Sequence, residues 1–113
     1  MRQLPKRFEM FTEEFPDVAE AYRVLGDTLS RSGPLDQKTI CLIKIGMSVG
    51  SGQEGATRSH TRKAIDAGAT REEIRHAVIV SVTTLGFPMM MRGLSWVDDV
   101  LSSEVTNGSP ELD

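Results

Sequence analysis

Helical spacing of apolar residues is clearest in the middle of the chain. Asp36 can cap the free N–H groups of a helix that continues to about Val49. The apolar positions recur at three- and four-residue spacing and form two neighbouring stripes: Ile40, Ile43 and Met47 in one, and Cys41, Ile45 and Ser48 in the other. This pattern predicts a helix with one side against a core.

A Gly-rich turn at residues 50–52 separates this helix from a second one. The second helix is predicted from Gln53 or Glu54 to Ala67, where Gly68 can adopt the left-handed conformation that ends helices. His60 lies in the middle of its stripe of small residues: Ala56, Ala64 and Ala67. Small residues let another helix approach closely, so His60 is expected in a tight contact rather than in water.

Two helices are predicted before this pair. Residues 4–14 form a short amphipathic segment in which Phe8 and Phe11 share a face. Pro16 suits the first turn of the next helix, because its missing N–H costs nothing there. The expected buried side of that helix consists of Val18, Ala21, Tyr22, Leu25 and Leu29. Residues 30–34 should end it.

A capping box marks the start of the fifth helix, with Thr70 and Glu73 three residues apart. Its later residues are β-branched and could also form a strand: Val78, Ile79, Val80 and Val82. The capping box and the lack of a partner strand favour a helix. Since its outer positions are as apolar as its inner ones, we expect it to be buried between subunits of a stable oligomer, a trimer or hexamer.

The segment Gly86-Phe87-Pro88 should break the chain, and Pro88 should open a sixth helix. Two apolar stripes run along that helix: Met90, Leu94, Val97 and Leu101, and beside them Met89, Gly93, Trp96 and Val100. The methionines are interpreted as adaptable core filler. From Glu104 onward the sequence is polar and predicts a disordered tail.

Length and charge add limits on function. A chain of 113 residues predicts one domain, placed at residues 1–103, with the tail at 104–113. The net charge of −3 argues against nucleic acid or an anionic membrane as a partner. The single cysteine excludes an internal disulfide, and no apolar run is long enough to span a membrane. With no signal peptide visible, these features predict a soluble cytoplasmic protein.

Four short segments in order give the chain a family resemblance: LDQKT at 35–39, SH-x-RKA at 59–64, GAT-x-EEI at 68–74 and GFP at 86–88. Together they resemble the carboxymuconolactone decarboxylase family, whose other main branch is the alkyl hydroperoxidase D type. The resemblance implies an all-α fold of about six helices that assembles into trimers or hexamers.

The chain departs from the peroxidase branch at its catalytic residues. That branch has Cys-x-x-Cys-x-x-x-His with a relay glutamate on the preceding helix. Counting back from His60, Gln53 and Ala56 occupy the two cysteine positions, and Cys41 occupies the position of the glutamate. Disulfide cycling cannot run without the two sulfurs, and only His60 carries over. The GFP segment is more like that of the decarboxylase branch.

The candidate catalytic residues are His60, Cys41 and Glu54, each with a structural alternative. A histidine of ordinary pKa, about 6.5, can move protons at neutral pH, but His60 could equally be a core residue with a hydrogen-bond partner. Cys41 could be a reactive thiolate with Lys44 three residues on, and Lys44 is also the candidate substrate-binding residue; a buried apolar cysteine is favoured. Glu54 could be an acid or base, but pairing with Arg58 four residues later is favoured.

The remaining charged residues are interpreted as surface. Arg58, Arg62 and Lys63 could attract a carboxylate, but a solvated face is favoured, with Asp66 available to Arg62. His76 shows no partner in the sequence and is expected at the surface.

Three functions follow from this reading. The first is non-redox proton transfer or decarboxylation on a small carboxylated or lactone substrate, with His60 as the acid or base and neither metal nor cofactor. The second is a peroxidase that uses Cys41 alone and an outside thiol. The third is a non-catalytic oligomeric binding protein.

Overall fold

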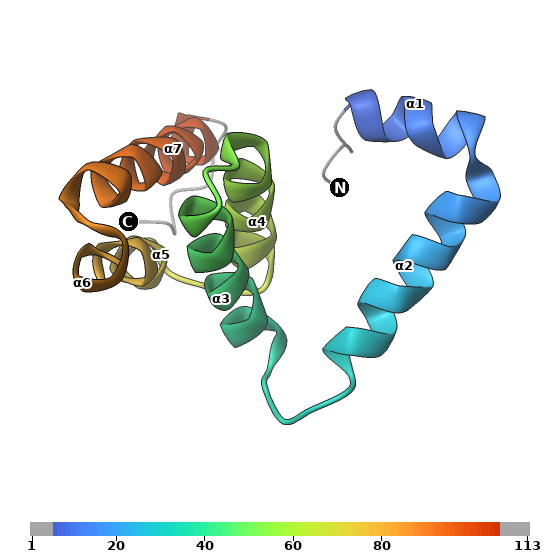
Figure 1. The fold of residues 1–113 in the computed structure, drawn as a ribbon, viewed down its shortest axis with the longest axis horizontal. Coiled ribbons are helices and arrows are strands. Elements are labelled where there is room, and N and C mark those ends of the chain that lie inside the picture. The colour runs from blue at the N-terminus through green and yellow to red at the C-terminus, as the bar shows by residue number, and fades with distance from the viewer. Residues whose placement is uncertain (1–5, 107–113) are drawn as a thin grey trace. The chain divides into compact units, whose positions relative to one another are not determined.

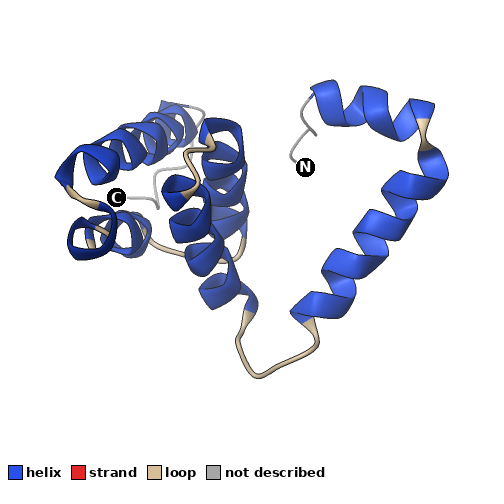
Figure 2. Ribbon diagram, in the orientation of Figure 1, coloured by secondary structure: helices blue, strands red, loops and turns tan. Residues whose placement is uncertain are grey.

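The computed structural model describes residues 6–106, and these residues form helices joined by loops, with no strand among them (Figures 1 and 2). The predicted all-α fold of about six helices is confirmed. Contacts group the chain into two compact units, Met1–Leu35 and Asp36–Asp113. The single domain over residues 1–103 stays a prediction, because this grouping describes contacts within one chain.

The first unit contains α1 (Lys6–Glu14) and α2 (Pro16–Ser30). Pro16 opens α2, as predicted, and the rings of Phe11 and Phe15 lie 5.4 Å apart where the two helices meet. Only Ala19 is buried in α2. The predicted buried side is not covered within the first unit, where these residues are exposed: Val18, Ala21, Tyr22, Leu25 and Leu29. Within the unit α2 packs against the short helix α1, which is too small to cover that side.

The second unit holds the core. Its helices are α3 (Gln37–Gly50), α4 (Glu54–Asp66), α5 (Arg71–Ile79), α6 (Val82–Leu85) and α7 (Phe87–Thr106). Helices α3 and α4 form a hairpin, and α7 packs against α3, α4 and α5 (Figure 1). The largest fully buried apolar side chains come from α3, α5 and α7: Ile45, Val49, Ile74, Val78, Val97 and Leu101. This burial supplies the main stabilisation of the unit.

Side-chain caps start two of these helices where the sequence predicts them. An oxygen of the Asp36 carboxylate accepts a hydrogen bond from the Thr39 N–H at 2.8 Å. Both bonds of the capping box are present: the Glu73 N–H donates to Thr70 Oγ1 at 3.0 Å, and the Thr70 N–H donates to Glu73 Oε1 at 2.9 Å. Glu73 also pairs with Lys38 of α3 at 3.0 Å, so this cap links α5 to α3.

The fifth helix is shorter than predicted. It ends at Ile79, and α6 begins at Val82, so placing Val82 in the same helix is wrong. The buried Ser81 hydroxyl donates to the Val78 carbonyl at 2.6 Å, which satisfies an oxygen of the last turn locally. Ile79 and Val80 are exposed in the single chain, as their predicted role in a subunit contact requires.

The last helix is longer than predicted at both ends. It begins at Phe87 rather than Pro88, and it includes Glu104, the predicted start of the tail. Residues 107–113 of the predicted tail lie outside the described residues. Within the described part of the chain, no helix is both long and apolar enough to cross a bilayer.

Gly93 allows α7 to approach α3 closely. A Cβ atom at this position would lie 2.7 Å from Val49 Cγ1 and 2.8 Å from Val49 Cγ2, well inside van der Waals contact. Val49 is fully buried and its branched side chain has little rotamer freedom in a helix. The absence of a side chain at Gly93 therefore sets the spacing of these two helices.

Candidate functional site

His60 is partly buried on α4, and its two ring nitrogens have different surroundings. Nδ1 is buried and has no hydrogen-bond partner among the described residues. Nε2 is not among the buried atoms without a partner in that part of the chain. The predicted core histidine with a satisfied partner is therefore not observed.

Electrostatics keep His60 neutral near pH 7. Partial burial is the main reason that the pKa of His60 is lower than its ordinary value, and the positive charges of Lys63 and Lys44 lower it further. Lys63 lies one turn along α4, whereas Lys44 comes from α3. An imidazole with a lowered pKa is in its basic form at neutral pH, the form that accepts a proton.

A buried hydrogen bond near the turn fixes how α3 and α4 meet. Thr57 Oγ1 lies 2.9 Å from Ser48 Oγ, and the Ser48 hydroxyl donates to the Ile45 carbonyl at 2.9 Å. Both side chains are buried. A sliding of one helix past the other would lose the contact between these two hydroxyl groups, although each keeps a backbone acceptor on its own helix, Ile45 for Ser48 and Gln53 for Thr57. The contact thus helps to hold α3 against α4.

Cys41 is a buried residue of the core. Its side chain is 2% exposed and lies in the apolar core, where Gln37 Nε2 approaches the sulfur at 3.6 Å. No hydrogen bond joins Cys41 to His60 among the described residues. The charge of Lys44 contributes to the lowered pKa of His60, and its roles beside the Cys41 thiolate and in substrate binding stay predictions.

Glu54 takes the structural alternative that the sequence favours. It is exposed and pairs with Arg58 at 2.9 Å, and Arg58 also pairs with Asp99 of α7 at 3.1 Å. The pairs connect α4 to α7 at the surface. They occupy the Arg58 guanidinium, which leaves it less available to a substrate carboxylate.

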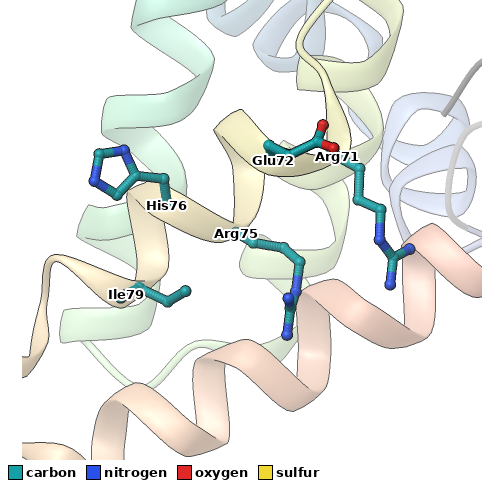
Figure 3. A pocket seen from close by; sticks show the side chains of 5 residues that line it. All are labelled: Arg71, Glu72, Arg75, His76 and Ile79. Atoms are coloured by element: carbon teal, nitrogen blue, oxygen red, sulfur yellow. The ribbon is translucent and has the colours of Figure 1, made fainter. Parts of the chain in front are cut away.

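A shallow surface pocket of about 320 Å³ lies elsewhere, along the outer side of α5 (Figure 3). The described residues that line it all come from this one helix: Arg71, Glu72, Arg75, His76 and Ile79. Arg75 is already paired with Asp98 at 2.9 Å, and His76 is exposed, as predicted. The side chains spread over an open helix surface and do not converge on one point, so we do not assign the site here.

Among residues 6–106, no group of three or more His, Cys, Asp or Glu side chains is arranged to hold a metal ion.

Comparison with known proteins identifies the family of this chain. The model of the carboxymuconolactone decarboxylase family matches residues 16–99, which include α2 and most of the second unit. The chain belongs to this family. It is also similar to an uncharacterized protein of Methanocaldococcus jannaschii, MJ0742, with 31% identity over 83 residues that cover 73% of this chain and 80% of that protein.

Membership confirms the resemblance carried by the four short segments. The family match spans α4, so His60 and both lysines near it lie within the family region. Sequence reasoning selected His60 and Lys44 but treated Lys63 as part of a solvated face. The three-residue spacing between His60 and Lys63 was the signal that could have connected them.

The lowered pKa of His60 predicts how stability changes with pH. The unfolded chain takes up a proton at this histidine near pH 6.5, whereas the native chain does so only at lower pH. The unfolded state therefore binds more protons in that window, and the free energy of unfolding should fall as pH drops below about 6.5. In His60→Gln this part of the loss should be absent.

Denaturant melts between pH 7.5 and 5.5 measure this difference. His76→Gln is the matched control, because His76 is the other of the two histidines and is exposed. The lowered pKa values of Asp36 and Glu73 act at more acidic pH, so they do not interfere. Equal pH dependence in the wild type and His60→Gln would contradict the prediction.

Proposed function

We propose that this protein is a non-redox acid–base catalyst of the decarboxylase branch, which acts on a small carboxylated or lactone substrate through His60. The observation that carries the proposal is the partly buried imidazole of His60, whose pKa is lowered first by burial and then by the charges of Lys63 and Lys44. A base needs a free lone pair within reach of the substrate proton, and we assign this role to Nε2, since only Nδ1 is a buried atom without a partner among the described residues.

Lys44 and Lys63 give this site a preference for an anion. Their positive charges favour a carboxylate near His60, and the bound carboxylate would in turn offset the charges that lower the pKa of His60. The imidazole would then accept a proton more readily with substrate bound than without it. The lysine charges thus favour binding of the carboxylate, and they favour proton transfer to His60 only after the carboxylate is bound.

A titration of the imidazole tests this mechanism without knowledge of the substrate. In proton NMR, addition of small carboxylates and carboxylated lactones should raise the pKa of His60 and leave the resonances of His76 unchanged. Lys44→Gln should weaken the response to the anion. A panel of such compounds that leaves the His60 resonances and pKa unchanged would contradict the anion-binding part of the proposal.

Dithiol peroxidase activity is expected to be absent. Gln53 and Ala56 stand where the two cysteines would be needed, and Cys41 is buried in the core. A thiol-coupled assay with an organic hydroperoxide should show no turnover above that of Cys41→Ser. Turnover that survives Cys41→Ser would show that the chemistry is misassigned, and turnover lost in this variant would support the single-cysteine peroxidase instead.

A further inference from the structure

We draw no further inference here: the strongest candidate, the apolar stripe along α2 that includes Val18, Tyr22, Leu25 and Leu29, carries no proposal because nothing in the structure shows what covers it.

Discussion

Gly93→Ala is expected to lower the free energy of unfolding by about 1–2 kcal/mol, although alanine is the better helix former. The new methyl group would meet both γ carbons of Val49 at less than 3 Å. Val49 is fully buried and cannot turn aside without disturbing the core between α3 and α7. Overpacking should therefore outweigh the gain in helix propensity, and denaturant melts would measure the difference.

Gly46 provides the control for this effect. It lies inside α3 with nothing within 4 Å of an added Cβ, so Gly46→Ala should raise stability by about 0.5–1 kcal/mol. Adding Val49→Ala to Gly93→Ala should recover part of the lost stability relative to the sum of the two single changes. A stabilising Gly93→Ala, or full additivity in the double variant, would show that the close approach is not strained.

Features that depend on local chemistry could be predicted from the sequence. The Asp36 cap and the capping box of Thr70 and Glu73 need only residues within one turn of each other, and both are observed. The turn at residues 50–52 and the positive φ of Gly68 are equally local. These signals, with helical periodicity, were sufficient for the all-α fold.

Features that depend on packing could not be predicted from the sequence. Periodicity identified an apolar stripe on α2 but could not say which surface covers it, and α1 leaves Tyr22 exposed within the first unit. The close contact of Gly93 with Val49 joins residues far apart in sequence, so no local sequence pattern predicts it. At the candidate site, the effect of the Lys44 charge on His60 depends on how α3 packs against α4, which the buried Ser48 side chain helps to set.

His60→Gln is expected to lower kcat/KM by about a hundredfold or more, the scale for removal of an acid–base group. The structure makes this prediction sharper than the sequence did. Since Nδ1 has no described partner, the substitution breaks no hydrogen bond there, and the loss of about 1–3 kcal/mol expected for a bonded core histidine should not occur at pH 7.5. His60→Gln should therefore lower activity without lowering stability at pH 7.5.

Activity is measured as the rate of deuterium exchange or decarboxylation of a carboxylated lactone in the presence of the wild type and of His60→Gln. Thermal melts of the same two proteins measure stability. In the wild type the rate should decline on acidification only below the ordinary histidine range, because the pKa of His60 is lowered before substrate binds. His76→Gln should leave the rate and its pH profile unchanged, since that side chain is exposed on another helix. Unchanged kinetics with a lowered melting temperature in His60→Gln would assign His60 to the core and end its catalytic assignment, whereas a wild type that accelerates neither reaction would favour a non-catalytic binding protein.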